Sequence, residues 1–281
     1  MTSTRTLKLG CTMTYTSTMP VATVAQVRPR LDDGVPEDET VSLSDESWSM
    51  IPELPVTDYR DLYGNHCRRF VIPQGTTSWT YAALATVPDA VDAADPDAEE
   101  VAPGDLPDDA LVYTLPSRFC ESDRLGNVAS KLFGSRPRGY QRVADICEWT
   151  WSYLTYAHGS SHSATSAYDV YGSGRGVCRD FAHLLVAMCR SLNIPARYAA
   201  GYLPDMDVEP LPTAMDFHAW TEVFLGGRWW AFDARHNERR KGRVKIGHGR
   251  DAADLASTTT YGAPFLSQFT VVCEEVVAPH A

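Results

Sequence analysis

Two adjacent glycines, Gly226 and Gly227, stand between strand-like runs at residues 218–225 and 228–233. A two-residue glycine turn flanked by such runs is typical of a β-hairpin, since glycine readily takes the left-handed conformations that a tight turn needs. This feature constrains the fold more than any other in the chain, because it predicts an antiparallel pair and also determines which residues face each other.

The register of this hairpin predicts a pair of polar side chains on one face. Counting outward from the turn places Trp220 opposite Asp233, and His218 shares the face of Trp220 because side chains alternate along a strand. His218 and Asp233 are therefore diagonal neighbours, roughly 7–8 Å apart between backbones, a gap that their side chains can close. A carboxylate in this place can hold the imidazole tautomer and stabilise the imidazolium. The alternative is that His218 and Asp233 are neighbours by chance on a half-buried hairpin and have no role in catalysis.

Two segments upstream of the hairpin have apolar residues at every third or fourth position, which predicts two amphipathic helices. The first begins at Tyr140. The second begins near Cys178 and ends before Pro195, since a residue that precedes proline avoids the helical region. A strand-like run at residues 196–202 follows. Helices followed by antiparallel strands indicate an α+β fold.

The first part of the chain has a different pattern. Short β-branched and aromatic runs separated by turn formers, such as residues 12–16 and 69–72, predict a β-rich domain. Residues 87–109 are rich in Ala, Asp, Glu, Pro and Gly, a composition that predicts a linker or a mobile loop. We therefore expect a β-rich N-terminal domain at residues 1–105, with the acidic linker at its end, and a second domain at residues 106–281.

Cys178 lies where a Gly/Ser-rich loop at residues 171–176 meets the first turn of the second helix. Unpaired backbone N–H groups and the positive end of the helix dipole favour an anion in this place, and hence the nucleophilic thiolate. The same N–H groups could donate to the oxyanion of a tetrahedral intermediate. These features predict a nucleophile at Cys178. The alternative is that it is a small buried hydrophobe, as most free cysteines are.

Other residues with suitable chemistry are less well placed. His183 lies five positions after Cys178, roughly 140° around the helix, so we expect it to point away from the thiol. Cys189 is three turns further on and fits the core. His158 and His162 have a spacing that could ligate a metal ion, but the Gly-Ser-Ser between them does not favour a helix. No metal site is expected.

The charge and composition argue against several classes of partner. The chain has 36 Asp and Glu residues against 25 Lys and Arg, a formal charge of -11, which opposes binding to nucleic acids and to anionic lipids. It lacks a run of roughly 20 apolar residues, and its start lacks the apolar stretch of a secretory signal. We expect a cytoplasmic protein that binds neither nucleic acid nor membrane. The seven cysteines form no CxxC pair, which argues against a disulfide framework and a structural zinc site.

Several segments together are similar to the bacterial transglutaminase-like superfamily, which includes candidate cysteine proteases. They are Gly176-Val177-Cys178-Arg179-Asp180-Phe181-Ala182-His183, Ile194-Pro195-Ala196-Arg197-Tyr198, Gly201-Tyr202, Phe217-His218-Ala219-Trp220-Thr221-Glu222-Val223 and Trp230-Ala231-Phe232-Asp233. The resemblance covers nearly the whole chain, because residues 249–254 resemble a further block of those proteins and residues 59–65 resemble the β-rich domain that precedes their core.

The resemblance implies a papain-like core, with helices packed on an antiparallel sheet, in which Cys178, His218 and Asp233 form the catalytic triad. Residues 106–281 would then be the catalytic domain.

The residues and the resemblance together predict a cysteine-dependent acyl-transfer enzyme that acts on a peptide or protein amide and needs no cofactor. In the first hypothesis, His218 takes the proton of Cys178, the thiolate attacks the carbonyl, and water resolves the thioester. In the second, an amine resolves the thioester, as in a transamidase. The third is a non-catalytic peptide-binding scaffold, and the complete Cys, His and Asp set counts against it. The oligomeric state does not follow from the sequence.

Overall fold

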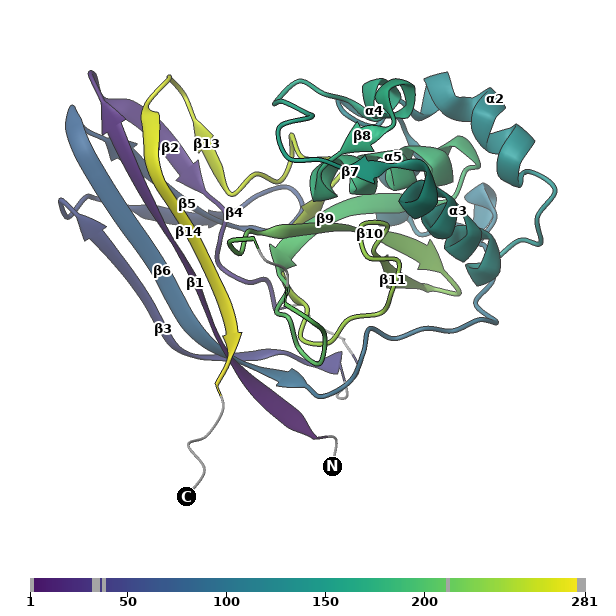
Figure 1. Ribbon diagram of the computed structural model, residues 1–281, viewed down its shortest axis with the longest axis horizontal. Helices are drawn as coiled ribbons and strands as arrows, with labels where there is room; N and C mark the ends of the chain where they lie inside the picture. The colour runs from purple at the N-terminus through teal and green to yellow at the C-terminus, as the bar shows by residue number, and fades with distance from the viewer. Residues whose placement is uncertain (1–2, 32–35, 37–38, 211–212, 277–281) are drawn as a thin grey trace.

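A computed structural model of the protein describes residues 3–31, 36, 39–210 and 213–276. Figure 1 shows two parts side by side, with long strands in one and helices over a smaller sheet in the other. The predicted α+β fold is confirmed, because helices pack on an antiparallel sheet next to a β-rich part. Within the described residues, no helix is both long enough and apolar enough to cross a lipid bilayer.

The β-rich part contains two four-stranded antiparallel sheets. Their strand orders are β14-β1-β6-β3 and β13-β2-β5-β4. In β6 buried and less buried residues alternate, as expected when one face of a sheet packs on a core. The strands are β1 (Thr4–Ser17), β2 (Val21–Ala25), β3 (Ser42–Ile51), β4 (Thr57–Arg60), β5 (His66–Ile72), β6 (Gly75–Pro88), β13 (Thr258–Thr260) and β14 (Phe265–Glu275).

The end of the described chain returns to the sheets that its beginning forms. Strand β14 pairs with β1, and β13 pairs with β2. Residues 258–275, which the predicted division assigns to the second domain, therefore lie in sheets of the first part. The boundary near residue 105 stays a prediction. A strand pattern indicates which face is buried, but it does not name the strand with which a segment pairs.

The smaller sheet carries the predicted hairpin. Its strand order is β11-β10-β9-β12, and every pair is antiparallel. Gly226 and Gly227 have φ angles of 57° and 89°, as the tight turn requires, and Leu225 faces Arg228. The predicted hairpin and its register are thus confirmed. The strands are β9 (Ala196–Tyr202), β10 (His218–Leu225), β11 (Arg228–Phe232) and β12 (Val244–Gly249).

Helix α5 (Cys178–Ser191) lies at the centre of the helical part, where it contacts α2, α3, α4 and strands β9 and β10. At the start of α5, the carboxylate of Asp180 accepts a hydrogen bond from the N–H of Val177 at 2.8 Å. Asn193, with a φ of 61°, follows the end of the helix. Both predicted helices are confirmed. The remaining elements are η2 (Pro103–Asp105), α1 (Asp108–Leu111), η3 (Val112–Thr114), α2 (Ser122–Phe133), α3 (Tyr140–Tyr153), α4 (Ala167–Ser173) and the parallel pair β7 (Thr155–Tyr156) and β8 (Arg175–Gly176).

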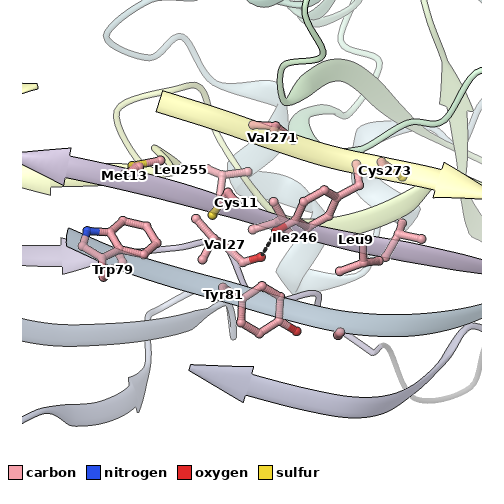
Figure 2. Packing of buried hydrophobic residues seen from close by; sticks show 14 of the residues in the cluster. Leu9, Cys11, Met13, Val27, Trp79, Tyr81, Ile246, Leu255, Val271 and Cys273 are labelled. Carbon is pink, nitrogen blue, oxygen red and sulfur yellow. Dashed lines mark hydrogen bonds between the residues drawn. The ribbon is translucent and has the colours of Figure 1, made fainter. Parts of the chain in front are cut away.

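Two buried apolar clusters hold the molecule together. One fills the helical part around α5. The other joins the two parts. In it, Ile246 and Leu255 lie among residues of the sheet β14-β1-β6-β3, here called the first sheet, such as Met13 (Figure 2). The buried Tyr202 hydroxyl donates to the carbonyl of Val27 at 2.9 Å across the same contact. The two parts therefore share a core.

The segment between β6 and η2, residues 89–102, connects the two parts and is here called the strap. It contains little regular structure, whereas the rest of the predicted linker, residues 87–109, includes the end of β6, η2 and the start of α1. Ion pairs fasten it to the second part: Asp92 binds Arg243, with both N–O distances 2.9 Å, and Glu100 binds Arg142 at 2.6 Å. Composition alone predicts that these acidic residues are exposed to solvent. In the structure they form ion pairs with arginines of the helical part.

Candidate active site

Cys178 is partly exposed, whereas the other six cysteines are buried. It is the first residue of α5, so the unpaired N–H groups of the first helical turn surround it. Its sulfur lies 4.0 Å from the carbonyl oxygen of Phe217, the residue before β10. The start of α5 and the start of β10 therefore meet at this thiol.

The segment before Cys178 differs from the predicted Gly/Ser-rich loop. Helix α4 covers its first half, Gly174 ends that helix in the left-handed conformation, and β8 follows. A capping box between Ser166 and Asp169 starts α4, and the Ser-x-x-Asp pattern is the sequence signal for it. Gly176 is required for another reason, since a Cβ there would lie 2.6 Å from the Cβ of Asp180.

His218 and Asp233 form the pair that the hairpin register predicts. His218 opens β10, Asp233 follows the last residue of β11, and the distance from His218 Nε2 to Asp233 Oδ2 is 2.7 Å. Their side chains are only 11% and 2% exposed. The other carboxylate oxygen, Oδ1, accepts the N–H groups of Arg235 and His236 at 3.1 and 3.4 Å. Asp233 is thus held from several sides.

The charges around this pair favour an imidazolium next to a carboxylate. Burial acts against the charged form of His218, but Asp233 and the Cys178 sulfur, which is within hydrogen-bonding reach, outweigh it and raise the pKa of His218 to about 9. Burial would also raise the pKa of Asp233, but His218 and Arg243 hold that pKa far below its usual range. The structure therefore brings Cys178, His218 and Asp233 together.

Arg243 connects the strap to this group, a role that the sequence patterns did not predict. Its Nη2 lies 3.3 Å from Asp233 Oδ2 and 2.9 Å from Asp92 Oδ2. Its guanidinium also lies over the ring of Trp220, 4.5 Å from the ring centroid. Arg243 stands beyond the end of the hairpin, and Asp92 lies in the strap. The guanidinium of Arg243 therefore contacts the carboxylates of both Asp92 and Asp233, and only the folded chain shows this arrangement.

A second imidazole, His236, stands next to His218, with ring centroids 5.0 Å apart. Among the described residues, His218, Asp233 and His236 form the one group whose possible ligand atoms all lie within 4.8 Å of one another, close enough to share a metal ion. Arg240 approaches His236 Nδ1 at 3.4 Å, and Arg243 approaches Asp233 at 3.3 Å. Two guanidiniums oppose a bound cation, so the arrangement fits a hydrogen-bonded network better than a metal centre.

Two of the other candidates from the sequence, His183 and Cys189, have packing roles, whereas His158 and His162 are exposed. His183 is buried, its Nε2 accepts the N–H of Ala252 at 3.1 Å, and its ring stacks on Phe119 with centroids 5.4 Å apart. Cys189 lies in the core of the helical part. His162 Nδ1 accepts the N–H of Ala164 at 3.2 Å, and within the described chain neither His162 nor His158 belongs to a group that could hold a metal ion.

A groove with a volume of about 680 Å³ opens over Cys178 and His218. Its walls come from both parts of the molecule, and apolar side chains predominate in them. Phe269 of β14 and Phe217 meet across the groove, with ring centroids 5.9 Å apart. The thiol and the imidazole are therefore accessible to a ligand that also touches the first sheet.

A smaller hollow of about 290 Å³ lies in the β-rich part, around Trp48. Its two arginines are already paired, Arg28 with Glu46 at 2.8 Å and Arg68 with Asp58 at 2.7 Å. The Arg68 guanidinium also covers the Trp48 ring. The larger groove is therefore the better candidate for a site of chemistry.

Comparison with known proteins agrees with this geometry. The family model described as "Transglutaminase-like superfamily" matches residues 126–234, a range that includes Cys178, His218 and Asp233. The crystal structure of a candidate cysteine protease from Cytophaga hutchinsonii is 32% identical, covers 99% of this chain and 93% of that chain, and superimposes with a TM-score of 0.85.

Two further proteins show weaker similarity, one over a shorter stretch and the other with a lower structural match. An uncharacterised protein from Mycobacterium leprae is 38% identical over 117 residues, which is 41% of this chain and 42% of that protein, so the match spans less than half of either. The periplasmic domain of TgpA from Pseudomonas aeruginosa is 15% identical over 82% of this chain and 90% of that chain, with a TM-score of 0.43, too weak a likeness to bear on function.

The match to the Cytophaga hutchinsonii structure extends over both parts of the molecule, and the family model covers the helices and the hairpin that carry the thiol, the imidazole and the carboxylate. Fold and relative together place the protein in a superfamily of cysteine-dependent enzymes. The chain belongs to the transglutaminase-like superfamily.

Proposed function

We propose that the protein is a cysteine-dependent amidase that hydrolyses a peptide or protein amide bond through a thioester at Cys178. One observation carries the proposal: Cys178 and His218 line the same groove, and Asp233 lies behind His218 at 2.7 Å. A nucleophile, a base and a group that orients the base are the parts that covalent acyl transfer needs. The Cytophaga hutchinsonii relative, described as a candidate cysteine protease, supports hydrolysis over the other reactions.

The first half of the reaction forms the thioester. Asp233 accepts the Nε2–H of His218, which leaves Nδ1 to take the proton of the Cys178 thiol. The sulfur attacks the carbonyl carbon of the substrate, and backbone N–H groups in the first turn of α5 can donate to the oxyanion. The C–N bond then breaks, and the imidazolium gives its proton to the leaving amine.

The second half releases the acid. His218, now neutral, takes a proton from water, whose oxygen attacks the thioester carbonyl. The C–S bond breaks, and the proton on His218 returns to the sulfur of Cys178. The products are a carboxylic acid and an amine, and the cycle needs no cofactor.

Mass spectrometry of peptide mixtures tests this proposal. The native protein and the Cys178→Ala variant would each be incubated with N-acetylated, C-amidated peptides in ¹⁸O-labelled water, with and without a primary amine. Hydrolysis by the native protein incorporates one ¹⁸O into each new carboxylate, whereas a transamidase incorporates the amine. Equal cleavage by the Cys178→Ala variant would exclude Cys178 as the nucleophile and overturn the proposal. No product from either protein would also overturn it and favour a binding scaffold.

A further inference from the structure

One wall of the groove is built by β14 and has an irregular register. Phe269 pairs with Met13 and Leu266 pairs with Tyr15, with a β-bulge in between. Met13 and Tyr15 are two residues apart and share a face, so the extra residue in β14 places Leu266 and Phe269 on that face as well. Without the bulge, two apolar side chains that are three residues apart would point to opposite faces.

This face is the inner face of the first sheet. Further along β14, Val271 and Cys273 are buried in the core that the two parts share (Figure 2). Leu266 and Phe269 lie beyond that core, and they remain 42% and 39% exposed and line the groove. The apolar inner surface of the sheet thus continues from the core into the groove that contains Cys178.

The main chain of β14 is also available at this point. In the described part of the chain β14 is the end strand of its sheet, with β1 on one side only, and Figure 1 shows it on the side of the helical part. Val276 donates its N–H to the carbonyl of Thr6. Since antiparallel residues alternate between facing the partner strand and facing away, the N–H and C=O of Phe269 point away from β1.

We propose that this wall binds an extended peptide segment of the substrate, with its apolar side chains against Leu266 and Phe269 and its scissile amide at Cys178. The substrate class is then a peptide with Leu, Phe or a similar residue close to the cleaved bond. A lipid or other acyl chain would use only the apolar side chains, whereas an extended peptide also pairs with the edge of β14. The proposal deepens the proposed function and rests on it for the reaction.

Binding to the Cys178→Ala protein tests the wall without turnover. The probes are fluorescein-labelled, blocked hexapeptides that carry Leu, Phe, Lys or Glu at each position in turn, measured by fluorescence polarisation. We expect the Leu and Phe peptides to bind most tightly. Adding Leu266→Ala and Phe269→Ala should weaken their binding by on the order of 10-fold each, because each truncation removes part of an apolar contact.

Two further variants serve as controls for this measurement. Phe265→Ala changes an aromatic residue of the same strand that is 71% exposed and does not line the groove, so binding should not change. Phe269→Leu keeps an apolar side chain and should recover most of the affinity. Thermal unfolding of each variant checks that the first sheet is intact.

The outcomes separate this proposal from the proposed function. Equal affinity for apolar and charged peptides, or unchanged binding after both truncations, would overturn the peptide wall even if the native protein hydrolyses amides. Selective binding that depends on Phe269, found together with no turnover by the native protein, would support the wall and overturn the amidase.

Discussion

The two histidines beside Asp233 should titrate on opposite sides of neutral pH. Burial disfavours the imidazolium of both, but Asp233 and the Cys178 sulfur raise the pKa of His218 to about 9. For His236 burial outweighs the opposing effect of Asp233, and with the charges of His218 and nearby arginines it lowers the pKa to about 4. NMR titration of the histidine ¹³Cε1–H signals would show both values in one spectrum, with His236→Gln to assign the signals.

Replacing Asp233 by Asn should reverse the behaviour of His218. The amide keeps the shape of the side chain but removes the charge that opposes the burial of the imidazolium. We therefore expect the pKa of His218 to fall from about 9 toward its ordinary value of 6.5 or below, while His236 stays neutral above pH 6. A His218 that still titrates near pH 9 in the Asp233→Asn protein would refute the assignment of Asp233 as its electrostatic partner.

The same shift predicts a change in stability with pH. A rise in the pKa of His218 from 6.5 to about 9 corresponds to roughly 3 kcal/mol, at about 1.4 kcal/mol per unit. Because the folded state binds the proton more tightly, this contribution is fully present below pH 6.5 and is lost as the pH rises through about 9. In urea titrations, the stability advantage of the native protein over Asp233→Asn should therefore shrink between these pH values. A constant difference would contradict the shift.

Four further predictions follow from the geometry. Cys178 should be the cysteine that iodoacetamide alkylates fastest near neutral pH, because the other six are buried, and peptide mapping that finds a faster one would reassign the nucleophile. The double variant His218→Ala, Asp233→Asn should turn over substrate scarcely more slowly than His218→Ala alone, and additive losses would mean that the two residues act apart. Arg243→Met should lower kcat/KM by roughly 10- to 100-fold, the cost of one hydrogen bond to a charged group, with partial recovery in Arg243→Lys; unchanged kinetics would exclude a positioning role. Deletion of residues 1–105 should leave an unfolded or insoluble chain, since β14 loses its partner strand, and a cooperative thermal transition in the truncated protein would contradict this.

The features that could be predicted from the sequence are those that depend on neighbours along the chain. Gly226 and Gly227 determine the hairpin because a two-residue turn allows few backbone geometries, and the register of that turn brings His218 to Asp233. The start of α5 at Cys178 follows from the glycines before it and the apolar period after it. In each case a local steric or periodic rule is sufficient.

The capping box of α4 is also local, yet it stands just before the segment that was predicted to be a Gly/Ser-rich loop, residues 171–176. Its Ser166 and Asp169 are a recognisable helix start, and the two glycines that follow conceal it, because glycine suggests a loop in the sequence whether it lies within a helix or at its end. Gly172 lies inside α4 and Gly174 terminates it. The segment is therefore a helix that ends in a turn.

The sequence alone determined helices α3 and α5, the hairpin and the pairing of His218 with Asp233, because these depend on turns and periods within a few residues. Only the tertiary structure decided that β14 returns to β1, that Asp92 and Arg243 support Asp233, and that α5 delivers Cys178 to His218. Such contacts join residues far apart in the chain. Their partners are selected by which apolar faces pack together and which buried charges must be neutralised, and no local pattern records that selection.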